Sequence, residues 1–359
     1  MMLGSTRRWL QISLCCSAIS PASIAQAQGV AVAEVAVVKA PDTSTPAEPA
    51  SDPPARVPPA TDEPPAQTVP ATLKGPIPEQ RISYDVTVGA RLNPLGLEAL
   101  YNIAYRHRLY ASDSAALRDN YFGVVLAPTI NPAITRFGVA LEFRPLSMLA
   151  FSGGVHQVGY VGSFKHLQSA PDGSQDYSDT GRGVRGDAGE NHPTHGLEAF
   201  ARVMAIVKLG PIVIRDELMF TYSKLMLPDG DEVYYHPRFD VLAPDSGWIM
   251  HNDSDILYLT DFGLAAGARA SVDATFIPEE VEGGKAGEDN SPFSRVGPMA
   301  AFMFFDDPGA SFNKPTLIAI SQWWLQHRFR TSQDVSQAIP MVTLAFRFEG
   351  DLFLDGRYE

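Results

Sequence analysis

Arginine and carboxylate side chains recur through residues 81–348, separated by even numbers of residues within each stretch. In residues 263–276, for example, Arg269 and Asp273 are four positions apart. A guanidinium group is planar, positively charged and rich in N–H donors, so it either attracts dissolved anions or pairs with carboxylates of the protein. The candidates for these two roles are Arg106, Arg108, Arg202, Arg215, Arg269, Arg328, Arg330, Glu142, Glu198, Glu217 and Asp273.

Even spacing places side chains on one face of a β-strand. In residues 263–276 one face is wholly apolar, and the other carries Arg269, Ser271, Asp273 and Thr275. This stretch is longer than an ordinary half-buried strand, and a tilted strand crosses a bilayer in roughly 9 to 11 residues. Similar stretches occupy residues 81–92, 97–109, 121–130, 136–144, 148–161, 197–209, 212–224, 255–261, 296–305, 317–330 and 339–348. The sequence therefore predicts about twelve strands.

Three polar insertions separate some of these stretches, at residues 163–195, 227–252 and 277–292. If the strand number is even and both ends of the sheet lie on one side, the insertions all fall on the opposite side. We therefore predict that residues 227–252 form a loop, because an extra strand would break this parity. Residues 181–186 match a dinucleotide-binding fingerprint in letters, but no strand and helix are predicted around them, so we interpret them as loop glycines.

The N-terminal region has the features of an exported protein. Two arginines, a short apolar run and small residues before position 28 indicate a signal peptide over residues 1–27, which contains the two cysteines, Cys15 and Cys16. Residues 28–80 are rich in proline and alanine and predict a disordered tether, either a simple leader or a segment with a periplasmic or cell-wall partner. The net charge of -13 and the lack of a basic run argue against nucleic acid as a partner.

These features together resemble a Gram-negative outer-membrane β-barrel protein, porin-like in the broad sense. The final stretch, Met341 to Phe348, has the alternating aromatic residues of a closing strand, although residues 349–359 follow as a C-terminal extension. The resemblance implies an all-β fold, a transmembrane antiparallel up-and-down barrel over residues 81–348. It also implies an outer-membrane location in contact with lipid, with the N-terminal tail in the periplasm.

The charged faces then point into the lumen, because charges facing lipid cost roughly 2 to 4 kcal/mol each for Arg or Lys. One interpretation is a narrow pore or transport protein for small solutes, anions among them. The alternative is a non-conducting structural or anchoring barrel braced by Arg-carboxylate pairs. A third class, a lipid hydrolase, would use His107, His327 and Ser321 on the outer wall, but His327 and Ser321 are too far apart along one strand to act together. We predict no cofactor and no metal.

Overall fold

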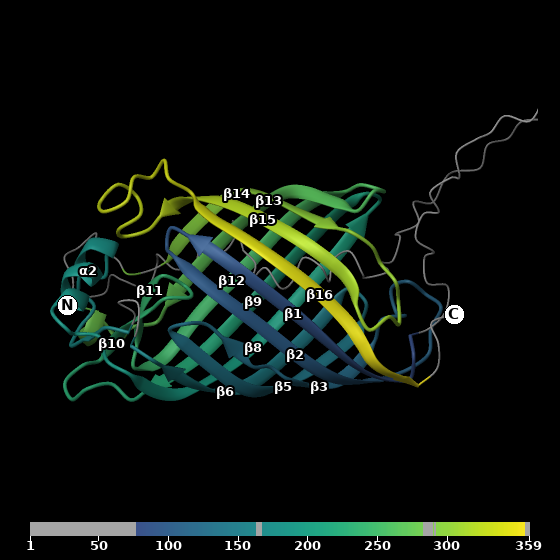
Figure 1. Ribbon diagram of the computed structural model, residues 1–359, viewed down its shortest axis with the longest axis horizontal. Helices are drawn as coiled ribbons and strands as arrows, with labels where there is room; N and C mark the ends of the chain where they lie inside the picture. Colours follow the sequence, from purple (N-terminus) through teal and green to yellow (C-terminus); the bar gives the residue numbers. More distant parts are fainter. Residues whose placement is uncertain (1–76, 163–166, 283–289, 291, 356–359) are drawn as a thin grey trace, which may run out of the picture.

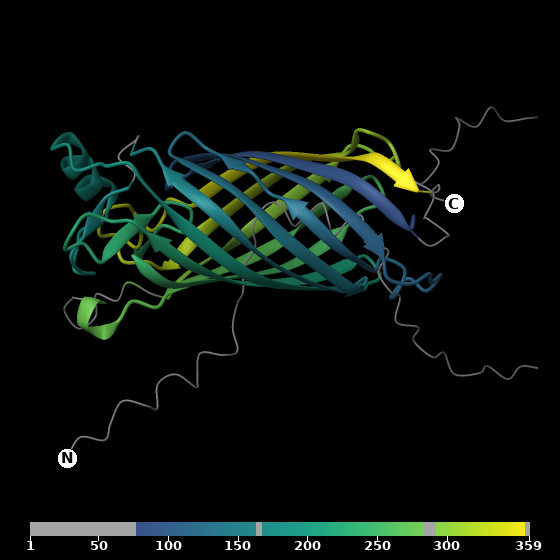
Figure 2. The same cartoon turned by 90° about the horizontal axis from the view of Figure 1, so that it is seen from below.

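The computed structural model describes residues 77–162, 167–282, 290 and 292–355. The predicted signal peptide, most of the predicted tether and residues 356–359 lie outside these residues. The described chain forms a closed barrel whose strands are tilted against its axis, with a small group of loops and short elements at one end (Figures 1 and 2). No helix among the described residues is long and apolar enough to span a membrane.

Twelve antiparallel strands make the wall, as the sequence predicts. They are β1 (Gln80–Leu92), β2 (Gly96–Arg108), β3 (Tyr121–Leu126) with β4 (Thr129–Ile130), β5 (Ile134–Leu146), β6 (Leu149–Tyr160), β8 (Thr194–Leu209), β9 (Ile212–Leu225), β12 (Ser246–Leu259), β13 (Leu264–Thr275), β14 (Phe293–Met303), β15 (Asn313–Gln326) and β16 (Met341–Asp355). The short strands β3 and β4 are two pieces of one wall strand, because both pair with β2 and with β5.

The barrel closes where β1 pairs with β16. Val86 of β1 lies opposite Tyr101 of β2 on one side and Phe348 of β16 on the other. Every wall strand thus has two neighbours, and no sheet edge is left open. A closed barrel satisfies the backbone hydrogen bonds of a sheet within lipid, where water does not reach.

The alternation in β13 confirms the inward and outward faces predicted from its sequence. Ala265, Arg269 and Asp273 are buried on the inward side, whereas Ala268 is exposed on the outward side. Large apolar side chains are exposed around the outer wall, Leu141, Ile256 and Leu344 among them. An outward apolar wall over an inward polar one is the arrangement of a barrel with lipid as its outer solvent.

The two ends of the barrel differ. At the near end, where β1 begins and β16 ends, β8 and β9 are joined by the short turn at Gly210, whose φ of +60° suits glycine. At the far end several connections are long, and these hold β7 (Ser169–Ala170), α2 (Asp179–Asp187), β10 (Val233–His236), β11 (Val241–Pro244) and α3 (Glu279–Glu282). The described loop residues of the three predicted insertions therefore lie at the far end, together with the connection from β15 to β16.

The prediction of a loop over residues 227–252 is partly wrong. Strand β12 begins at Ser246, and β10 and β11 form a separate three-stranded sheet with β7, so the parity of the wall is kept. The alternation of β12 is hidden because His251, Asp253 and Asp255 face inward while Asn252 and other polar residues face outward. Neither face of its central part is apolar.

Three other boundaries differ from expectation. The stretch predicted as one strand over residues 317–330 ends as a strand at Gln326, so Arg328 and Arg330 belong to the following connection. Strand β16 continues beyond Phe348 to Asp355, within the segment predicted as an extension. Residues 181–186 lie in helix α2, where the Ser178 hydroxyl caps the first turn by accepting a hydrogen bond from the Gly181 amide.

Candidate functional site

Ion pairs line the inward wall, within one strand or between strands that lie close together. Arg106 Nε contacts Glu142 Oε2 at 2.8 Å, and Arg215 Nη2 contacts Glu217 Oε2 at 2.6 Å, with Arg202 3.9 Å from the same Glu217. Glu198 binds Arg136, which the site prediction did not include, at 2.8 Å. Arg108 donates to the backbone carbonyl of Ile77 at the near end. The predicted wall charges are thus mostly paired, the arrangement expected of a braced barrel.

Arg269 and Asp273 each pair with residues of neighbouring strands. Arg269 Nε contacts Asp255 Oδ1 on β12 at 3.2 Å. Asp273 accepts from His251 Nδ1 at 2.6 Å and from Arg295 of β14. Each residue therefore links its strand to a neighbouring one, and none of these side chains is exposed to solvent by more than a tenth.

A hydrophobic plug occupies the far end of the barrel. It consists of β10, β11 and the residues between them, 233–244, and its buried side chains include Tyr234, Val241 and Leu242. They pack in one cluster with inward-facing wall residues that include Ile134 and Trp324. The 233–244 plug is therefore seated against the inner surface of the wall and does not extend away from it.

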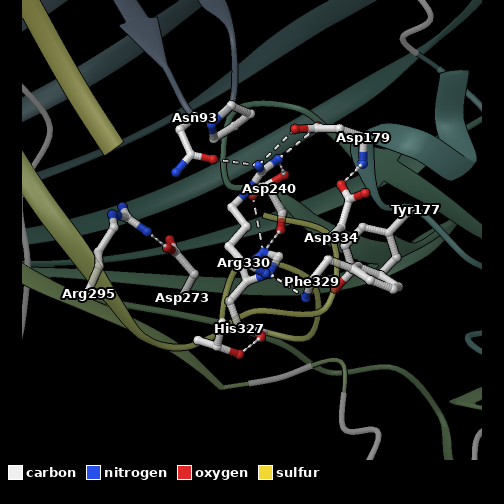
Figure 3. A network of polar contacts seen from close by, with 12 residues as sticks. Asn93, Tyr177, Asp179, Asp240, Asp273, Arg295, His327, Phe329, Arg330 and Asp334 are labelled. Atoms are coloured by element: carbon white, nitrogen blue, oxygen red, sulfur yellow. Dashed lines mark hydrogen bonds and ion pairs between the residues drawn. The ribbon is translucent and has the colours of Figure 1, made fainter. Parts of the chain in front are cut away.

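A polar network fastens this plug to the surrounding loops (Figure 3). Arg330 donates to Asp240 Oδ1 at 3.1 Å, to Asp179 Oδ2 at 3.0 Å and to Asn93 Oδ1 at 2.8 Å. His327 Nε2 lies 2.9 Å from the Asp240 carbonyl oxygen and 3.1 Å from its carboxylate. A single guanidinium thereby joins the β1–β2 turn, helix α2, the plug and the β15–β16 connection.

The charge of Asp240 is stabilised within this network. Burial alone raises the pKa of the carboxyl group, but the Arg330 guanidinium, followed by His327, holds it well below its usual range. Arg330 and Asp240 are each about 2 % exposed as side chains. The pair is thus a buried, charge-assisted contact between two loops that are distant in sequence.

Next to the plug lies a cavity of about 760 Å³. Its apolar lining includes Ile134, Phe239, Ile320 and Met341, and its polar lining includes Arg91, Glu98, Asp179, Arg182, Arg238, His251, Arg269, Arg295 and Gln322. Wall strands β1, β2, β5 and β12 to β16 contribute to the lining of the cavity, and so do the plug and α2. We call this space the chamber.

Two arginines that line the chamber, Arg91 of β1 and Arg238 of the plug, differ from the arginines that pair with carboxylates. Arg91 donates to the backbone carbonyls of Pro237 and Arg238, each at 2.7 Å, and to that of Pro94 at 3.2 Å. Arg238 lies over the Phe239 ring, 5.7 Å from its centroid. Neither guanidinium has a carboxylate partner within ion-pair distance among the described residues. Their positive charge is therefore not balanced by an adjacent carboxylate of the described chain.

The sequence prediction missed the plug because loop residues have no period. Asp240, Arg238 and Asp179 sit in connections where nothing in the local sequence indicates a site. One signal was present: residues 233–243 are mostly apolar, which is unusual for an exposed loop and indicates burial. Arg328 and Arg330, predicted to be on a strand, lie in the β15–β16 connection, where Arg328 donates to the Gly173 carbonyl and Arg330 to Asp240.

The residues named for a hydrolase are not brought together. His107 is exposed on the outer wall of β2, Ser321 lies on β15, and β1 and β16 stand between these strands. The prediction that His327 faces lipid is wrong, since its side chain is buried beside Asp240 in the plug network. The described residues also contain no group of three His, Cys, Asp or Glu side chains arranged to hold a metal ion.

Comparison with known proteins finds structural likeness at low sequence identity. No protein-family model and no curated protein sequence matches the chain. Among solved structures, the Acinetobacter baumannii outer membrane protein Omp33 is 9 % identical, with 78 % of this chain and 100 % of that chain covered and a TM-score of 0.31. The translocator domain of the autotransporter NalP from Neisseria meningitidis is 10 % identical, covering 77 % and 89 %, with a TM-score of 0.33. The CymD monoaromatic hydrocarbon channel is 6 % identical, covering 78 % and 90 %, with a TM-score of 0.34.

Proposed function

We propose that this protein is a narrow outer-membrane channel that passes small anionic solutes through the chamber. The observation that carries the proposal is the chamber of about 760 Å³ with Arg91 and Arg238 unpaired by carboxylates beside it. Wall pairs such as Arg106 with Glu142 balance each other and attract neither sign of ion. Selectivity for anions then depends on the chamber, where the guanidinium groups meet a solute.

The 233–244 plug acts in this proposal as the narrow part of the path. It lies at the far end, and Arg238 and Phe239 carry its cationic and aromatic side chains to the chamber. A solute enters past these residues and leaves through the near end. The network around Arg330 keeps the plug seated, so conductance is small and selective, not that of an open porin.

The ion permeability of the reconstituted protein tests the proposal. We expect discrete conductance in a planar bilayer and a reversal potential that favours chloride over potassium under a salt gradient. In Arg238→Gln, loss of one unit charge at a distance of about 5 Å removes roughly 0.8 kcal/mol, so the anion preference should fall about four-fold at low salt.

The control is Arg185→Gln, because Arg185 of helix α2 pairs with Glu190 and does not line the chamber. Its selectivity should match that of the unchanged protein. A bilayer that stays silent at all voltages would overturn the channel proposal. It would favour the alternative of a structural barrel, for which the paired wall charges are the supporting observation.

A further inference from the structure

The chamber contacts two apolar clusters of the barrel interior. Ile134, Phe239 and Met341 belong to the cluster that includes the plug. Ile320 and Ala345 belong to a second cluster, which inward side chains of β8, β9 and β12 to β16 form toward the near end. All five residues line the chamber. A molecule in the chamber therefore meets apolar side chains both at the plug and on the side of the near end.

Small inward side chains beside the seam of the barrel make room for an apolar body. Gly89 of β1 lies directly opposite Ala345 of β16, and both line the chamber. Met341, Thr343 and Ala345 alternate on the inward face of β16 and also line it, and at about 3.3 Å per residue they cover roughly 13 Å of strand. The chamber is thus long enough for an organic molecule, and its volume of about 760 Å³ lies within the usual range of small-molecule sites.

Pairing of its carboxylates leaves the chamber with a positive charge. Among the described residues that line it, the carboxylates are Glu98 and Asp179. Glu98 Oε1 lies 3.7 Å from Arg136 Nη1, and Asp179 Oδ2 lies 3.0 Å from Arg330 Nη1. Both negative charges are therefore opposed by arginines that do not line the chamber, and the charge of its own arginines remains in excess.

The guanidinium of Arg238 is placed to receive an anionic group. The residue is partly exposed, and its guanidinium lies over the ring of Phe239, next to the chamber. Arg91 donates to the backbone carbonyls of Pro237 and Arg238, which fixes this part of the plug and adds a second positive charge beside it. A guanidinium can donate two parallel hydrogen bonds to a carboxylate, a geometry that a spherical ion cannot use.

We propose that the solute of the chamber is an organic carboxylate with a compact apolar body. This inference rests on the proposed channel function and narrows its anions to one chemical class. The carboxylate binds at Arg238, while the apolar body lies against Ile320, Met341 and Ala345. A small hydrated anion would lose water on entering a space with so much apolar lining and would regain few polar contacts. The organic anion instead gains from burial of its apolar part.

Three related compounds test both halves of this recognition. Cyclohexanecarboxylate has the charge and the apolar body, cyclohexanecarboxamide has the body without the charge, and acetate has the charge without the body. Binding is measured by titration calorimetry on the protein in lipid nanodiscs, with empty nanodiscs as the blank. The dissociation constant of cyclohexanecarboxylate should be about ten-fold lower than those of both other compounds, since each of them lacks one contact. Equal binding of acetate or of the amide would overturn the proposal.

Two variants locate the contacts. Arg238→Gln should reduce the affinity for cyclohexanecarboxylate to that for its amide. Ala345→Leu places a larger side chain in the space of the apolar body, so it should weaken cyclohexanecarboxylate and leave acetate unchanged. Arg185→Gln, outside the chamber, should bind as the unchanged protein does. Heat-modifiable mobility on a denaturing gel checks that each variant is folded. Unchanged binding in both folded chamber variants would contradict the proposed site.

Calorimetry needs no voltage, so its result is separate from conductance. A protein that conducts chloride but does not bind cyclohexanecarboxylate would overturn the inference about the solute and leave the channel proposal in place. A protein that binds cyclohexanecarboxylate with the predicted dependence on Arg238 but stays silent in a planar bilayer would overturn the channel proposal and support the site.

Discussion

At the scale of single residues, Arg330 connects more of the far end than any wall charge does. Its guanidinium binds Asp240, Asp179 and Asn93, which come from three different connections. Removal of one partner from a buried pair leaves an uncompensated charge and costs about 3 to 5 kcal/mol. This loss of stability falls on the plug, because the wall strands are joined by backbone hydrogen bonds that do not involve these side chains.

We therefore expect Arg330→Ala to loosen the plug while the barrel stays folded. Limited proteolysis should cleave the far-end connections faster than in the unchanged protein. Far-UV circular dichroism and heat-modifiable mobility should be unaltered. Arg185→Ala is the control, because Arg185 pairs with the partly exposed Glu190 and donates to the Ser169 carbonyl, and neither of these partners belongs to the plug. Equal protection of the loops in both variants would show that Arg330 does not hold the plug.

The same network predicts how the plug responds to acid. The pKa of Asp240 is lower in the folded protein than in the unfolded chain, so its stabilisation is complete above the ordinary carboxyl range. This stabilisation is lost as the pH falls through the lowered pKa. The plug should thus stay seated in mild acid.

At the scale of elements, the strands on one side of the barrel pack closely around an aromatic stack. His156 of β6 lies over Phe200 of β8, with ring centroids 5.2 Å apart. Gly138 of β5 leaves room for this ring: a Cβ at this position would lie 2.1 Å from His156 Cδ2 and 2.2 Å from the Val155 carbonyl oxygen. The glycine is required by the spacing of the strands and not by its backbone angle.

Gly138→Val should accordingly weaken the barrel. The added side chain pushes His156 off Phe200 and strains β5 against β6, and overpacking of this kind costs about 1 to 3 kcal/mol. The measurement is the urea midpoint of the protein in lipid vesicles. Gly96→Val serves as the control, because the nearest atom to its Cβ would be 3.6 Å away. A midpoint shift of the same size in both variants would contradict the packing argument.

At the scale of the whole molecule, the barrel has one apolar outer surface with aromatic side chains toward its rims. Trp248 and Trp323 are exposed toward the far rim, whereas their neighbour Trp324 points inward and is 1 % exposed. Indole rings prefer the interface between lipid headgroups and hydrocarbon. The far rim should therefore lie at one membrane surface.

Brominated lipids can locate this rim. In variants that keep one tryptophan, fluorescence from Trp248 or Trp323 should be quenched more by bromines near the headgroups than by bromines near the bilayer centre. Trp324 should be quenched weakly by both, because the wall separates it from lipid. Stronger quenching of Trp248 by the deeper bromines would mean that the membrane covers the barrel differently.

The wall of this barrel is determined locally by sequence. Lipid outside and polar contacts inside impose an alternation that each strand must carry by itself, as residues 264–275 do, so strand number and facing can be predicted without any partner. The prediction fails in β12, where both faces of the central residues are polar. There Asp216, Asn252 and Ser254 carry polar side chains on the outward face. Only the pairing of β9 with β12 shows that Asp216 and Ser254 lie opposite each other.

The far end is decided by tertiary structure. Asp240 and Arg330 are 90 positions apart, and Arg330 and Asn93 are 237 apart, so no local pattern connects them. Arg328 and Arg330 continue the even spacing of β15, and only the end of pairing at Gln326 moves them into the plug network. Even spacing predicts the face on which a charge lies, because a strand has a period of two. Which charge it meets depends on how the connections fold over the mouth of the barrel.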